Sequence, residues 1–276
     1  MYTKILESMK KEMLRRSYSQ RTIDTYLASI QRFLDYCNKE PRKIKKADIK
    51  NYLDLLAERK MSGSSLNISL SAIKFLIEDS LHRNININLR FSKMPKTLPL
   101  FLTKEETLRL FDAIENKKHK LMVQMMYSAG LRVSELLNLR LADLDFENSY
   151  GWVRHGKGNK DRIFIIAERL KDSLKEHIDE NKLAQNEHLF IGFKKNKMHP
   201  SSVRRIIEKA SVKAKLTKNA HPHTLRHSFA THFIEDGYKV TDLQPLLGHN
   251  SIKTTMVYVH MANPKMLSVK SPFDSL

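Results

Sequence analysis

Apolar residues at helical spacing run through the first part of the chain, stop at Asn84 and return only after Leu102. Before this break, apolar side chains recur every three or four residues in short segments, which predicts amphipathic helices. The break is rich in asparagine, proline and basic residues, a composition typical of an extended connection. Thr103 and Glu106 then form a capping-box pattern that begins a new helix. The chain is therefore predicted to fold as two domains.

The two domains are predicted to differ in architecture. Residues 1–87 form a bundle of about four short helices, followed by a basic linker over residues 88–101. Residues 102–276 form mostly helices, with one β-hairpin in which Tyr150–Arg154 and Arg162–Ile166 flank a glycine-containing loop. Further helices are predicted at about residues 168–181, 201–215, 223–237 and 241–247, and after Asn250. The predicted fold class is mainly α with a small β component.

Positive charge is spread over both predicted domains. The 276 residues include 49 basic and 30 acidic side chains, a formal net charge of +19. The first 100 residues contribute +10, from 20 basic and 10 acidic residues, and the remainder contributes +9. A polyanionic partner is expected, nucleic acid first and an acidic membrane surface second, with a solvated basic surface as the alternative. Because both parts are basic, we expect both to face the same anion.

Composition also narrows the class of protein and its location. The single cysteine, Cys37, excludes a disulfide framework and a multi-cysteine metal site. No apolar run approaches the ~18 residues of a membrane span. Charged residues interrupt the N-terminal stretch where a signal peptide would have its apolar region. We therefore expect a cytoplasmic location.

Arg132 is the first candidate for chemistry. It follows the small, flexible run Ser128-Ala129-Gly130, which suits a close approach of the backbone to a ligand at a helix start. The alternative is a helix-surface arginine paired with Glu135, three residues further on.

Lys157 is the second candidate. It lies on the predicted hairpin loop between Gly156 and Gly158, where a flexible amine can reach an anion in a groove. The alternative is an ordinary solvated turn lysine.

A histidine-rich run supplies the next candidates. His223 and Arg226 lie one turn apart on one predicted helical face, where both can meet a single phosphate. Zinc is the alternative, because His223 and His227 are four residues apart on a helix. No glutamate follows His223 as in a zinc-protease helix, so a metal is not expected.

The last candidates lie near the C-terminus. Gly248 is predicted to end a helix in a left-handed conformation, so that His249 emerges from the turn. Tyr258 lies on the next predicted helix. The alternatives are a local hydrogen bond for His249 and a half-buried core position for Tyr258.

Taken together, these candidates resemble the catalytic set of the tyrosine recombinases, the phage-integrase and Xer family. Four stretches carry the resemblance: SAGLRVSELLNLR at 128–140, GKGNKDR at 156–162, HPHTLRHSFATHFIEDG at 221–237 and LLGHNSIKTTMVYVH at 246–260. The family's catalytic positions fall on Arg132, Lys157, His223, Arg226, His249 and Tyr258 without a departure. The likeness is greatest to the two-domain Xer branch. The first domain matches only in kind, where the family keeps its helical, SAM-like core-binding domain.

The resemblance implies covalent DNA chemistry. Tyr258 would attack the scissile phosphate, forming a 3′-phosphotyrosyl link and releasing a 5′-hydroxyl. A phenol with a pKa near ~10 needs its proton removed during attack. His223 would be the general base or proton shuttle, and Lys157 the general acid for the leaving oxygen.

The resemblance also assigns the groups that hold the phosphate. Arg132 and Arg226 would neutralise it through their planar, always-charged forks. His249 would hydrogen-bond it, and Glu135 would fix Arg132 from behind. No metal, cofactor or ATP is implied.

Family members act as DNA-bound tetramers and recombine two sites through a Holliday junction. The segment 263–276 would pass to a neighbouring subunit, with simple disorder as the alternative. Its apolar anchors would be Met266, Leu267, Val269 and Phe273.

The expected role is Xer-like chromosome-dimer resolution at a specific DNA site, with nucleoid association. An accessory protein or DNA translocase is a further candidate partner. The alternatives are an integrase or excisionase of a mobile element, a type IB-like DNA relaxase and, last, a non-catalytic DNA-binding protein.

Overall fold

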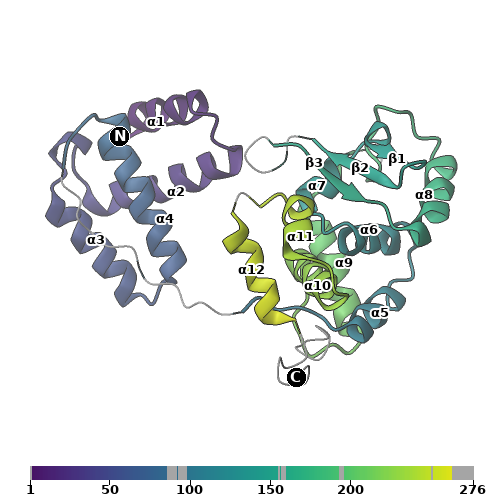
Figure 1. The fold of residues 1–276 in the computed structure, drawn as a ribbon. Coiled ribbons are helices and arrows are strands. Elements are labelled where there is room, and N and C mark those ends of the chain that lie inside the picture. The colour runs from purple at the N-terminus through teal and green to yellow at the C-terminus, as the bar shows by residue number, and fades with distance from the viewer. Residues whose placement is uncertain are drawn as a thin grey trace, which may run out of the picture. The chain divides into compact units, whose positions relative to one another are not determined.

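The computed structural model describes residues 2–85, 92, 98–154, 156, 160–192, 196–249 and 251–262. The chain divides into two compact units, Met1–Lys96 and Thr97–Leu276. Figure 1 shows both units. Three predicted features lie wholly or mostly outside the described residues: Lys157, the linker and the C-terminal segment 263–276.

The first unit is a helical bundle. Its elements are α1 (Thr3–Arg15), α2 (Gln20–Cys37), the 3₁₀ turn η1 (Pro41–Lys43), α3 (Lys46–Glu58), α4 (Gly63–Lys74) and the π-helical turn η2 (Phe75–Ser80). Side-chain caps begin two of these helices, since Ser19 accepts from the backbone of Thr22 and Ser62 from that of Ser65. These local signals explain why the predicted helices form in this unit.

One apolar core holds this bundle together. Met9 and Met13 of α1 and Phe33 of α2 are fully buried among the apolar faces of the other helices. A buried hydrogen bond of 3.3 Å between the hydroxyls of Ser29 and Ser69 joins α2 to α4. Basic side chains of these helices, such as Lys10 and Lys46, are exposed outside this core.

The second unit is mostly helical. Its helices are α5 (Lys104–Asp112), α6 (Lys117–Ser128), α7 (Val133–Asn138), the 3₁₀ turn η3 (Leu141–Asp143), α8 (Glu168–Glu180), α9 (Pro200–Lys213), α10 (Pro222–Glu235), α11 (Val240–Leu247) and α12 (Ile252–Met261). The capping box is present: Thr103 Oγ1 accepts from Glu106 N, and Thr103 N donates to the Glu106 carboxylate. The prediction of a mainly α fold with a small β component is confirmed.

A small antiparallel sheet completes this unit. The strands β1 (Leu144–Asp145), β2 (Tyr150–Val153) and β3 (Arg162–Ile165) follow one another in sequence order. The predicted hairpin corresponds to β2 and β3. The prediction missed β1, which is too short at two residues to show a period-two pattern.

The register of the hairpin decides which side chains face inward. Gly151 pairs with Phe164, and a Cβ at Gly151 would come within 2.4 Å of the Phe164 ring. Along β3, Arg162 and Phe164 are buried while Ile163 and Ile165 are exposed. The sheet therefore turns an arginine toward the interior.

Helix α10 is buried on most of its surface. It packs against α6, α9, α11 and α12, and nine of its fourteen residues are buried. Together with α11 and α12 it forms a second core that includes Leu243, Leu247 and Tyr258. Side chains of α10 can thus meet residues from distant parts of the sequence.

In the described part of the chain, no helix combines the length and the apolar character that crossing a membrane requires.

Candidate active site

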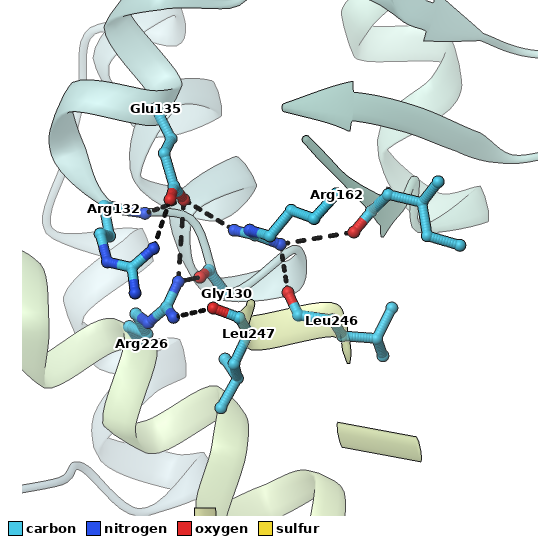
Figure 2. A network of polar contacts seen from close by, with 8 residues as sticks. Gly130, Arg132, Glu135, Arg162, Arg226, Leu246 and Leu247 are labelled. Atoms are coloured by element: carbon cyan, nitrogen blue, oxygen red, sulfur yellow. Dashed lines mark hydrogen bonds and ion pairs between the residues drawn. The ribbon is translucent and has the colours of Figure 1, made fainter. Parts of the chain in front are cut away.

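Three arginines converge on one buried carboxylate, that of Glu135 (Figure 2). Arg132 Nη1 lies 2.5 Å from Glu135 Oε1, and Arg162 Nη2 lies 2.7 Å from Oε2. Arg226 Nη1 is 3.7 Å from Oε2, and the Arg132 backbone N–H donates to the same oxygen at 2.9 Å. Burial opposes ionisation of Glu135, but the charge of Arg162 and the hydrogen bonds prevail, so its pKa is lowered.

Arg226 is fixed by backbone carbonyls from two other segments. Its Nη1 donates to Gly130 O at 2.7 Å, and its Nη2 donates to Leu247 O. The side chain is almost fully buried. Burial, followed by the charge of Arg132, lowers its pKa to about 9, only partly offset by Glu135. A second negative charge nearby would reverse this shift.

Two glycines allow these segments to approach. Gly130 has a φ of +55°, and a Cβ there would lie 2.5 Å from the ring of Phe229 on α10. Gly248 has a φ of +61°, and a Cβ there would meet Arg162 Cδ at 2.8 Å. The predicted left-handed end of α11 is therefore present. The absence of a side chain at Gly130 allows close packing against Phe229 of α10.

Arg162 was not predicted as part of this site. It donates to Glu135 and to Leu246 O, and so connects β3 with α7 and with the end of α11 (Figure 2). Its Nε is buried without a hydrogen-bond partner in the described part of the chain. The available signal was an arginine at an inward position of a strand whose alternate residues are apolar.

Tyr258 lies against this network in the core formed by α10, α11 and α12. Tyr258 is only 3% exposed, so it occupies a core position, as the alternative prediction stated. Burial raises the pKa of Tyr258, and the charges of Arg226 and Arg132 act in the opposite direction. The nucleophile candidate is thus close to the two arginines predicted to hold a phosphate.

The hydroxyl of Tyr258 contacts His227, a residue that was considered only as a zinc ligand. The distance between Tyr258 Oη and His227 Nδ1 is 3.0 Å. His223, the predicted base, is exposed, and its ring centroid lies 6.4 Å from that of His227. Within the described ranges, no hydrogen bond joins His223 to Tyr258.

His249 emerges beyond Gly248, as the sequence predicted. Its Nδ1 lies 2.9 Å from Thr255 Oγ1, which is the local hydrogen bond named as the alternative. Its ring stacks with that of Tyr258 at a centroid distance of 6.4 Å and an interplanar angle of 12°. His249 therefore borders both the tyrosine and the arginine network.

A cavity of about 400 Å³ opens beside the network. Arg132, Arg162 and His249 line it, together with Asp161. Lys160, at the described end of the hairpin loop, lines it as well.

The two remaining histidines of the histidine-rich run, His221 and His232, have hydrogen-bond partners away from Tyr258. His221 Nδ1 accepts from the backbone of Thr224 at the start of α10, and His232 Nδ1 lies 2.8 Å from Tyr127 Oη. Over the described ranges, no three histidine, cysteine or acidic side chains are grouped so as to hold a metal ion.

Two half-buried histidines, His227 and His249, predict a pH dependence of stability. Burial lowers the pKa of His227 and of His249 to about 4, with neighbouring positive charge adding to the effect. An unfolded histidine titrates near ~6.5 and so binds more protons than the native one between these values. The free energy of unfolding is therefore expected to fall as the pH drops from about 6.5 toward 4. Denaturant titrations at pH 7 and pH 5 measure this change.

The matched control is the double variant His227→Asn/His249→Asn. Its loss of stability between pH 7 and pH 5 is expected to be smaller than that of the parent. An equal loss in both proteins would show that these two imidazoles are not its source.

Comparison with known proteins shows the family of this chain. The family model described as "Phage integrase family" matches residues 100–264, and "Phage integrase, N-terminal SAM-like domain" matches residues 5–87. The fold and the site define a DNA strand-transferring enzyme, and the chain belongs to the phage integrase family, the tyrosine recombinases.

Xer recombinases are among the proteins that the chain resembles. Tyrosine recombinase XerA of Pyrococcus furiosus is 34% identical over 265 residues, covering 94% of this chain and 90% of that protein. The crystal structure of XerA recombinase matches with a TM-score of 0.56 at 32% identity, covering 97% of this chain and 96% of that one. XerH bound to a palindromic difH substrate shares the fold, with a TM-score of 0.74 at 22% identity, covering 94% and 82%.

Proposed function

We propose that this chain is a site-specific recombinase that cleaves and rejoins duplex DNA through a 3′-phosphotyrosyl link to Tyr258. The observation that carries the proposal is the buried cluster in which Arg132 and Arg226 share one carboxylate beside the tyrosine. Arg162 occupies the other side of that carboxylate, so three guanidinium groups face one negative charge. A phosphodiester supplies the charge that this cluster lacks.

Arg132 and Arg226 stabilise the negative charge that gathers on the phosphate oxygens during attack. Preorganised donors of this kind are commonly the largest catalytic contribution. Backbone carbonyls and Glu135 already hold both side chains, so little reorganisation accompanies the reaction. Glu135 acts as the residue that positions Arg132.

The remaining roles follow the catalytic set. His249 donates to a phosphate oxygen, and His223, exposed at the start of α10, serves as the proton shuttle to solvent. Lys157 protonates the leaving 5′-oxygen. Lys157 lies outside the described residues, but Gly156 and Lys160 on either side of it line the cavity beside Arg132.

Recombination of two sites adds an assembly to this chemistry. We propose a tetramer on paired DNA sites that acts through a Holliday junction, with residues 263–276 exchanged between subunits. The covalent link conserves the energy of the broken bond, so rejoining uses no ATP. An accessory protein or DNA translocase remains a candidate regulator.

The proposed role is resolution of chromosome dimers in the cytoplasm, at the nucleoid. The relatives named Xer support this role. Footprinting of the bound DNA tests it: a single chromosomal site is expected, whereas a site at the border of a mobile element would favour integration or excision.

Trapping on nicked DNA tests the chemistry. A duplex of the bound site with a nick next to the cleavage position loses a short fragment after attack, so the covalent complex accumulates. The parent protein is expected to form this complex, and Tyr258→Phe is expected to form none above background while still binding the duplex. Denaturing gel electrophoresis measures the complex.

Tyr127→Phe is the matched control. Tyr127 is also hydrogen-bonded to a histidine, yet it contacts His232 instead of the arginine network. It should trap DNA as the parent does. Equal trapping by Tyr258→Phe and the parent would assign the nucleophile to another residue.

A further inference from the structure

Tyr258 of α12 and His227 of α10 are hydrogen-bonded to each other. The hydroxyl and the imidazole nitrogen Nδ1 are 3.0 Å apart, and the two ring centroids are 5.8 Å apart. Among the residues that the structure describes, His227 is the hydrogen-bond partner of this hydroxyl. The atom that must lose its proton is therefore already in contact with an imidazole.

The direction of this hydrogen bond follows from the burial of the tyrosine. A buried phenol O–H donates to an acceptor, and His227 Nδ1 is the acceptor within reach. The ring then carries its hydrogen on Nε2. Burial is the main cause that lowers the pKa of His227 to about 4, and this value agrees with a neutral imidazole at pH 7.

We propose that His227 is the catalytic residue that takes the proton of Tyr258. The inference rests on the proposed function of Tyr258 as nucleophile. His223 is exposed and lies one turn earlier on α10, so it is the next imidazole through which the proton reaches solvent. The rings of His227, His223 and His221 follow one another at centroid distances of 6.4 and 6.3 Å.

The proton and bond changes of this step balance. The O–H bond of Tyr258 breaks and its proton binds His227 Nδ1, while Oη forms a bond to phosphorus. The bond from phosphorus to the 5′-oxygen breaks, and the general acid protonates that oxygen. In rejoining, the 5′-hydroxyl attacks phosphorus and gives its proton back to the general acid, while the bond from phosphorus to Oη breaks and His227 returns its proton to Oη.

The arginines make this transfer depend on DNA. Burial is the main cause that disfavours a positive charge on His227, and the charges of His223, His221 and Arg226 add to it. A bound phosphate brings a negative charge to the arginine cluster and offsets the repulsion from Arg226. Tyr258 therefore keeps its proton until a phosphodiester occupies the arginine cluster.

Substitution of His227 by asparagine separates proton transfer from positioning. Asn Oδ1 can stand near the place of Nδ1 and accept the hydrogen bond, but it cannot take the proton. His227→Asn is expected to slow single-turnover cleavage by about 10²–10⁴-fold, with binding of the same duplex unchanged. Rapid-quench kinetics on the nicked duplex measures the rate.

A more acidic nucleophile provides a second test of the proton transfer to His227. Incorporation of 3,5-difluorotyrosine at position 258 gives a phenol that needs less help from a base. The deficit of His227→Asn relative to its parent is expected to shrink in this background. A deficit of unchanged size, or cleavage by His227→Asn at the parent rate, would overturn the proposal.

His223→Asn is the matched control, because His223 lies one turn away on the same helix. Its deficit should not depend on the acidity of the phenol. If only the His223 deficit shrinks, His223 is the base. If Tyr258→Phe itself traps DNA, the proposed function fails, which is a separate outcome.

Discussion

Replacing Glu135 by glutamine is expected to lower the free energy of unfolding by about 3–5 kcal/mol. The side chain is 6% exposed and bonds Arg132 and Arg162 at 2.5 and 2.7 Å. Removing one partner of a buried pair leaves the other charges without compensation, and here three guanidinium groups lose their shared carboxylate. Denaturant titration followed by circular dichroism measures the change.

The matched control for this substitution is Glu176→Gln. Glu176 pairs with Lys117 at 3.0 Å on an exposed surface, where an ion pair contributes about 0–1 kcal/mol. If Glu135→Gln costs no more than this control, Glu135 does not hold the arginine network together.

Replacing Arg226 by glutamine is expected to slow cleavage of the nicked duplex by about 10²–10³-fold. Glutamine keeps an amide donor for one of the two carbonyls, of Gly130 and Leu247, that Arg226 now reaches. It removes the positive charge that we propose faces the phosphate. Single-turnover kinetics with saturating protein measures the loss.

A neutral linkage distinguishes the charge of Arg226 from its packing. With a methylphosphonate at the cleavage position, there is less negative charge to stabilise, so the deficit of Arg226→Gln should become smaller. Arg109→Gln, on the exposed face of α5, is the control and should leave both rates unchanged. An equal deficit on both linkages would contradict a charge-neutralising role.

Features set by neighbouring residues could be predicted from the sequence. The capping box at Thr103, the hairpin from Tyr150 and the left-handed end of α11 at Gly248 each depend on residues a few positions apart. The same is true of the pairing of Arg132 with Glu135. Local chemistry decides these contacts whatever the rest of the chain does.

Features set by long-range packing could not be predicted. Arg162 reaches Leu246 across 84 positions, and His227 reaches Tyr258 across 31. No local pattern distinguishes His227 from His223, because only the packing of α12 on α10 decides which imidazole meets the phenol. The role of Lys157 stays a prediction from the sequence.

Three guanidinium groups share the one carboxylate of Glu135. This excess of positive charge affects how long the protein survives in the cell. A ligand that binds only the folded state stabilises it by RT ln(1 + [L]/Kd), and DNA that neutralises Arg132 and Arg226 as we propose would be such a ligand. Molecules on DNA should therefore open less often than free molecules. Cellular proteases, which cut opened chains, would then remove surplus recombinase first and leave the molecules engaged at a site.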